Sequence, residues 1–86
     1  MKQFDYIIKD PSGTHADPAV MLGKKAREFG GTSITVSKGE NSALATKLMA
    51  LIGLGAQCGD MVTVTVEGEQ EDAAYKAIEE FMVENM

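Results

Sequence analysis

The only histidine of the chain, His15, stands among residues whose types and spacing suit phosphoryl chemistry. Gly13 favours a turn before it, and Asp17-Pro18 begins a helical pattern directly behind it. Backbone N–H groups at a helix start have no acceptor within the helix, and the helix dipole adds partial positive charge, so such a start attracts anions. Because imidazole is a nucleophile that is partly neutral at neutral pH, we expect His15 to accept a phosphoryl group and pass it on. The plainer alternative is an exposed histidine at a turn.

Other chemistries fit the sequence less well. Cys58 is the only cysteine, so it forms no disulfide within the chain. A catalytic pair of Cys58 with His15 is a remote enzymatic alternative, because nothing in the local sequence activates the thiol. One histidine and one cysteine make no convincing zinc site, and the late carboxylates are typical of a hydrated helix face. We expect neither a metal ion nor another cofactor.

The composition is that of one small globular domain. The chain has 86 residues, of which 44% are hydrophobic and 24% charged, and its formal net charge is −5. The negative charge argues against nucleic acid as a partner. No apolar run resembles a signal peptide or approaches the roughly 20 residues of a membrane span. We therefore expect a single domain over residues 1–86 that is cytoplasmic, has no membrane partner and is a monomer by default.

Hydrophobic patterning predicts an α+β fold. Strands are expected near residues 4–8, 32–37, 40–44 and 61–67, and amphipathic helices over residues 17–29, 46–54 and 70–84. Alternating strands with one dry face, together with amphipathic helices, suggest a four-stranded antiparallel sheet with three helices on one face.

The expected second helix carries more apolar residues than one short helix can bury. These residues are Leu48, Met49, Leu51 and Ile52. Some exposure is therefore forced, and an exposed apolar patch usually marks a contact site. The Met49 side chain is flexible and polarizable, which suits a surface that accepts several partners, so we expect it to be exposed.

Together these features resemble the HPr family, the histidine-containing phosphocarriers of the bacterial phosphoenolpyruvate:sugar phosphotransferase system. The resemblance covers essentially the whole chain and rests on Pro11-x-Gly13-x-His15-x-x-Pro18-Ala19, Leu54-Gly55, Gly59-Asp60 and Val62-Thr63-Val64. It implies an HPr-like open-faced β-sandwich, which agrees with the fold expected from the patterning.

The resemblance also implies a function for His15. Enzyme I would phosphorylate its Nδ1 atom, with phosphoenolpyruvate as the source, and His15 would deliver the phosphoryl group to sugar-specific IIA domains. Such a protein turns over no free substrate, so we expect a carrier rather than an enzyme. The phosphate would be stabilised by the start of the following helix, at Ala16, Asp17, Pro18, Ala19 and Val20. Both partners would dock on Lys24, Lys47, Leu48, Met49, Leu51 and Ile52.

Two positions depart from the family pattern. Asp17 stands where the family has an arginine, which would bond phosphate oxygens in a forked geometry. A carboxylate about 5 Å from the phosphate costs roughly 3 kcal/mol at an effective dielectric near 20, before salt screening. Aspartate before proline is also a favoured helix N-cap, which is a purely structural role. Lys47 aligns with the regulatory serine of many relatives, so the resemblance does not extend to serine regulation.

The alternative function is an HPr-like regulatory binding module. It would dock partner proteins, with a transcription regulator as one candidate, and would carry phosphate poorly because of Asp17.

Overall fold

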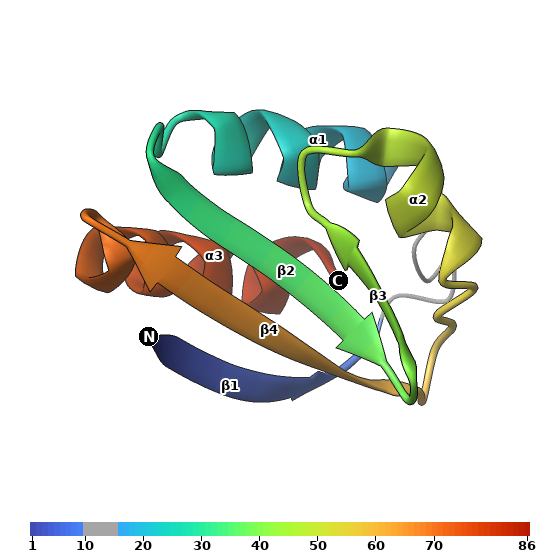
Figure 1. The fold of residues 1–86 in the computed structure, drawn as a ribbon. Helices are drawn as coiled ribbons and strands as arrows, with labels where there is room; N and C mark the ends of the chain where they lie inside the picture. Colours follow the sequence, from blue (N-terminus) through green and yellow to red (C-terminus); the bar gives the residue numbers. More distant parts are fainter. Residues whose placement is uncertain (10–15) are drawn as a thin grey trace.

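A four-stranded antiparallel sheet, in the order β1-β4-β2-β3, forms one layer of the protein. The computed structural model describes residues 1–9 and 16–86, and it describes the backbone alone at residues 16–18. The elements in chain order are β1 (Lys2–Ile7), α1 (Ala16–Arg27), β2 (Thr32–Lys38), β3 (Asn41–Leu44), α2 (Leu48–Gly53), β4 (Met61–Gly68) and α3 (Glu71–Asn85). Figure 1 shows the helices gathered on one side of the sheet. The predicted α+β fold is confirmed.

The sequence of β4 explains why one face of the sheet is shielded from solvent. Val62, Val64 and Val66 are buried, whereas Thr63 and Thr65 between them are half-buried on the other face. This period-two alternation is what a strand with one covered face requires. The pairing register places buried valines of β4 beside buried residues of β2. The two central strands therefore form the side of the core that the sheet contributes.

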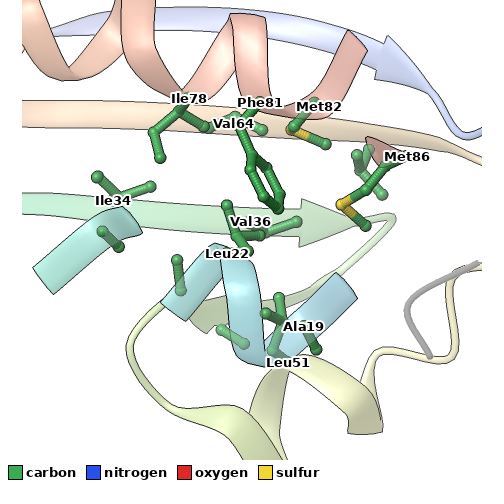
Figure 2. Close-up of a cluster of buried hydrophobic side chains, with 14 of the residues drawn as sticks. Ala19, Leu22, Ile34, Val36, Leu51, Val64, Ile78, Phe81, Met82 and Met86 are labelled. Carbon is green, nitrogen blue, oxygen red and sulfur yellow. The ribbon is translucent and has the colours of Figure 1, made fainter. Parts of the chain in front are cut away.

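The helices close the core from the same side. In Figure 2, Leu22 of α1, Ile78 and Phe81 of α3, and Val36 and Val64 of the sheet lie in one cluster of buried side chains. Leu22 and Ile78 are fully buried, and Phe81 is 7% exposed. Spacings of three and four residues place such side chains on one helix face, which is why the patterning predicted these helices.

Local hydrogen bonds move several boundaries from their expected positions. The α1 helix ends at Arg27 rather than near residue 29, because Phe29 N–H donates to the Ala26 carbonyl at 3.2 Å in a three-residue turn. The α2 helix begins at Leu48 rather than at Thr46, because the Lys47 N–H is used in a turn to the Leu44 carbonyl at 2.9 Å. Hydrophobic spacing carries no signal for these turns.

No helix in the described part of the chain has the length and apolar character that crossing a membrane requires.

Candidate functional site

The predicted phosphate site begins where α1 begins. His15 and the rest of residues 10–15 lie outside the described residues. The α1 helix starts at Ala16, so its backbone begins immediately after His15 in the sequence. The side chains of Ala16, Asp17 and Pro18 lie outside what the structure describes, so the role of the Asp17 carboxylate stays a prediction from the sequence.

The start of α1 corrects two sequence expectations. Asp17 is the second residue of the helix, so it belongs to the first turn and is not the N-cap. Pro18 has no backbone N–H and cannot donate to a phosphate; its fixed φ is compatible with the first turn. In a helix that begins at Ala16, the regular bonding pattern pairs the Val20 N–H with the Ala16 carbonyl. The same pattern leaves the amides of Ala16 and Asp17 without an acceptor inside the helix, and the Ala19 side chain is fully buried.

An exposed surface of apolar and basic residues lies beside this start, where α1 packs against α2 (Figure 1). We call it the α1–α2 face. It consists of Val20, Lys47, Leu48, Met49 and Ile52. Lys24, predicted to dock with them, instead lines a hollow between α1 and α3. A shallow hollow lined by Val20 of α1 and Leu48 of α2 joins the two helices. Gly23 of α1 lies close to the connection between β3 and α2, where an added Cβ would lie 3.2 Å from the Ala45 carbonyl oxygen.

The α2 residues that were predicted to dock partners differ in how exposed they are. Met49 is 79% exposed, which confirms the expectation for that side chain. Leu48 and Ile52 are half-buried and pack against the core. Leu51 is fully buried, so its assignment to the docking surface is wrong. A six-residue helix turns one face inward, and Leu51 occupies that face.

The basic residues near this surface have different roles. Lys24 and Lys47 are both exposed; Lys47 directly precedes α2, whereas Lys24 lines the hollow between α1 and α3. Arg27 donates from its guanidinium to the Thr46 carbonyl oxygen at 3.2 Å and so ties α1 to the turn before α2. Lys25 Nζ lies 3.9 Å from Glu28 Oε2, in an ion pair with the residue that follows α1. The structure therefore gives Arg27 a positioning role that the sequence did not indicate.

The sequence also missed a cluster of polar contacts around Asp60. Lys38 Nζ, at the end of β2, lies 3.0 Å from Asp60 Oδ2 and donates to the Gly55 carbonyl oxygen at 3.2 Å. The Gln57 N–H donates to the same Asp60 oxygen at 2.9 Å. The pKa of the Asp60 carboxyl is lowered from its ordinary 3.8, first by the Gln57 backbone hydrogen bond and then by the Lys38 side chain. No local sequence motif signals this cluster, because Lys38 ends β2 whereas its partners lie in the connection between α2 and β4.

The lowered pKa of Asp60 predicts a pH-dependent contribution to stability. A carboxyl whose pKa is lower in the folded than in the unfolded state stabilises the fold above its unfolded pKa. That contribution is lost as the pH falls below the ordinary 3.8 and through the folded value. Urea unfolding of Asp60→Asn and the unaltered protein should therefore differ near neutral pH, and the difference should shrink in this acidic range. A difference that is the same at every pH would contradict the assignment.

Two other candidate chemistries receive no support from the described residues. Cys58 is exposed, and its Sγ–H points to the Lys9 carbonyl oxygen at 3.6 Å, a contact that does not activate a thiol. Among residues 1–9 and 16–86, no group of three or more His, Cys, Asp or Glu residues is arranged to hold a metal ion.

The sequence and fold of this chain are similar to those of known proteins. The family model described as "PTS HPr component phosphorylation site" matches residues 2–84. The phosphocarrier protein HPr of Lysinibacillus sphaericus is 36% identical over 98% of this chain and 94% of its own length. A multiphosphoryl transfer protein of Xanthomonas campestris is 35% identical over 94% of this chain, which corresponds to 10% of that protein. A crystal structure of HPr from Thermoanaerobacter tengcongensis matches with a TM-score of 0.92 at 30% identity, over 99% of this chain and 94% of that one.

The fold and these relatives assign this chain to a class of small domains that carry phosphoryl groups. The chain belongs to the HPr family of phosphocarriers of the bacterial phosphotransferase system.

Proposed function

We propose that this protein accepts a phosphoryl group from Enzyme I on His15 and passes it to sugar-specific IIA domains in the cytoplasm. The observation that carries the proposal is the α1–α2 face. Its most exposed apolar residue, Met49, stands on the helix that packs against α1, and α1 begins directly after His15 in the sequence. An exposed apolar residue on a helix that a lysine directly precedes suits a surface that binds partners briefly and releases them.

The chemistry needs one nucleophile and a place for the phosphate oxygens. The neutral His15 imidazole attacks the phosphorus of the phosphorylated donor in line, and the bond from phosphorus to Enzyme I breaks as the new phosphorus–nitrogen bond forms. First-turn amides at Ala16 and Asp17 then stabilise the added charge. Transfer to the acceptor reverses these steps. Because each partner completes the site when it docks, the carrier positions and holds the group and releases no product of its own.

A direct assay tests this function. We expect incubation with phosphoenolpyruvate and Enzyme I from the same organism to add the mass of one phosphoryl group, and brief acid treatment to remove it. His15→Ala should gain no mass. Subsequent addition of a IIA domain should return the carrier to its original mass. A phosphoryl group that resists acid, or one retained by the His15→Ala variant, would overturn the proposal.

Asp17 gives the proposal a quantitative consequence. Its carboxylate repels both the phosphoryl group and any acidic surface of the donor, whereas arginine attracts both. Asp17→Arg should therefore raise the rate of phosphorylation by Enzyme I, by about tenfold if repulsion of about 1.4 kcal/mol is relieved. Stopped reactions at low Enzyme I concentration measure this rate.

Asp17→Asn serves as the matched variant for that measurement. It removes the charge without adding a forked donor, so it should give part of the gain. Equal rates in all three proteins would show that position 17 does not influence the transfer.

The regulatory alternative has no specific observation in its favour. The relatives described above are named as phosphocarriers or a phosphoryl transfer protein, and the argument from Asp17 rests on one position.

A further inference from the structure

A hollow of about 270 Å³ lies between the edge strand β1 and the second half of α3. The α3 helix packs against β1 and runs beside it in the same direction (Figure 1). Lys2 pairs with Asp72 near the start of the helix, and the Tyr6 hydroxyl donates to the Met82 carbonyl oxygen at 2.9 Å near its end. We call this space the β1–α3 hollow, and it shares no residue with the α1–α2 face.

The apolar part of the lining comes from both elements. Phe4 and Tyr6 of β1 are half-buried. The Phe4 ring meets Tyr75 edge to face at 5.2 Å between ring centroids, and the bond from Tyr6 to Met82 holds the second ring. Val83 of α3 lines the same hollow and is 65% exposed. A partner can therefore cover a preformed apolar surface without having to order it first.

The charged part of the lining is negative. The exposed carboxylates of Glu79, Glu80 and Glu84 line the hollow, and no described lysine or arginine does. None of these three glutamates forms an ion pair with a cation of residues 1–9 or 16–86. Asp5 also lines the hollow, but its Oδ1 already accepts from Thr63 Oγ1 at 2.7 Å. The three α3 carboxylates are thus available to a cation from outside.

These carboxylates are unfavourable for the helix that carries them. The C-terminal end of a helix dipole favours cations, yet the last turn of α3 has no basic residue and contains Glu84. Glu80 and Glu84 are four residues apart, so their charges repel each other across one turn. Lys24 and Lys25 line the neighbouring α1–α3 hollow together with these two glutamates but form no ion pair with them. A cationic ligand would relieve the repulsion.

The first half of α3 already holds a cation in a similar setting. Lys2 Nζ lies 3.2 Å from Asp72 Oδ1 and 5.7 Å from the centroid of the Tyr75 ring. One ammonium group thus contacts a carboxylate and lies within the roughly 6 Å at which a cation is attracted to an aromatic face. The β1–α3 hollow presents the same residue types, carboxylates and aromatic rings, without a described cation among them.

We propose that the β1–α3 hollow is a docking site for a basic segment of a partner protein, in which a lysine or arginine stands next to an apolar residue. The cation meets the α3 carboxylates, and the apolar side chain covers Val83 and the two rings. A second copy of this chain carries the same net charge of −5, which opposes self-association. The volume lies below the roughly 300–1,000 Å³ of small-molecule pockets, which suits polypeptide side chains.

A short fluorescent peptide that alternates arginine and leucine tests the charge requirement. Fluorescence anisotropy at low salt measures its affinity for the unaltered protein and for the triple variant Glu79→Gln, Glu80→Gln and Glu84→Gln. The triple variant should bind at least about fivefold more weakly, because exposed charge contacts are individually weak but three are lost together. Circular dichroism should show an unchanged fold, since the substituted side chains are exposed.

The chain offers a matched control for net charge. Glu40, Glu67 and Glu69 are exposed and lie outside the hollow. Replacing all three by glutamine changes the net charge by the same amount and should leave the affinity for the peptide within about twofold. Equal weakening by the two triple variants would overturn the proposal, because net charge alone would then explain binding.

A second pair of variants tests the apolar requirement. Val83→Ser should weaken peptide binding at least about threefold. Met61→Ser removes a comparably exposed apolar side chain at the start of β4, outside the hollow, and should leave the affinity within about twofold. Equal affinity of Val83→Ser and the unaltered protein would overturn the apolar part of the site.

Amide chemical shifts locate the bound peptide. The peptide should shift the amides of Phe4, Tyr6 and residues 79–84 and leave those of Lys47 and Met49 unchanged. Shifts centred on the α1–α2 face, or no binding at low salt, would overturn the proposal. Self-association of the unaltered protein that the α3 glutamine variant abolishes would also overturn it, since the hollow would then bind a second copy. None of these measurements requires a phosphoryl group on His15, so this site and the proposed function fail independently.

Discussion

Replacing Gly68 by alanine is expected to lower the free energy of unfolding by about 3 kcal/mol. Gly68 ends β4 with a φ of 147°, a region essentially restricted to glycine. An added Cβ would lie 2.5 Å from both the Gly31 carbonyl oxygen and the Thr32 Cα. Both obstacles are backbone atoms, so relief requires moving the start of β2 and not a side-chain rotation. Urea denaturation followed by circular dichroism measures the loss.

Two other glycines make this prediction specific. Gly39 has a φ of 60° but nothing within 4 Å of its added Cβ, so Gly39→Ala should lose about 1 kcal/mol from backbone strain alone. Gly30 has an open surrounding and no positive φ, so Gly30→Ala should change stability by less than about 0.5 kcal/mol. Equal losses at Gly68 and Gly39 would show that the close contacts at Gly68 do not matter.

Met49→Glu is expected to weaken binding to Enzyme I by at least about tenfold, equivalent to about 1.4 kcal/mol. Met49 is 79% exposed on α2, within the α1–α2 face, and a carboxylate there would have to be dehydrated against a partner's apolar surface. The same exposure means that folding should hardly respond, with a change in unfolding free energy below about 0.5 kcal/mol. Titration calorimetry and thermal unfolding measure the two effects separately.

Met61→Glu is the matched control. Met61 is 56% exposed at the start of β4, outside the α1–α2 face, and the substitution adds the same charge. It should leave the affinity for Enzyme I within about twofold. Equal weakening by the two substitutions would mean that net charge, and not the α1–α2 face, controls binding.

The fold was largely predictable because its signals are periodic and local. The valine–threonine alternation of β4 and the apolar spacing of α1 and α3 each determine which face is buried, and the structure buries those faces. The ends of elements were less predictable. The turn that holds Thr46 outside α2, for example, depends on a hydrogen bond from Lys47 to Leu44 that hydrophobic spacing does not encode.

In the candidate site, only the exposure that the composition of α2 makes unavoidable was predictable. Four apolar residues in a six-residue helix require exposure, and Met49 is exposed as expected. Which of these four residues faces the core depends on how α2 packs against its neighbours. The prediction therefore placed Leu51 on the docking surface, whereas it is buried. The contacts of Lys38 with Gly55 and Asp60 join residues far apart in the sequence, and no local pattern signals them.

The proposed function requires His15 to be the phosphorylated residue. Because His15 is the only histidine, its imidazole resonances are unambiguous in nitrogen-15 NMR spectra. After reaction with phosphoenolpyruvate and Enzyme I, we predict phosphorus–nitrogen coupling at Nδ1 and a free Nε2. An unmodified imidazole in a protein that has gained a phosphoryl group elsewhere would contradict the account.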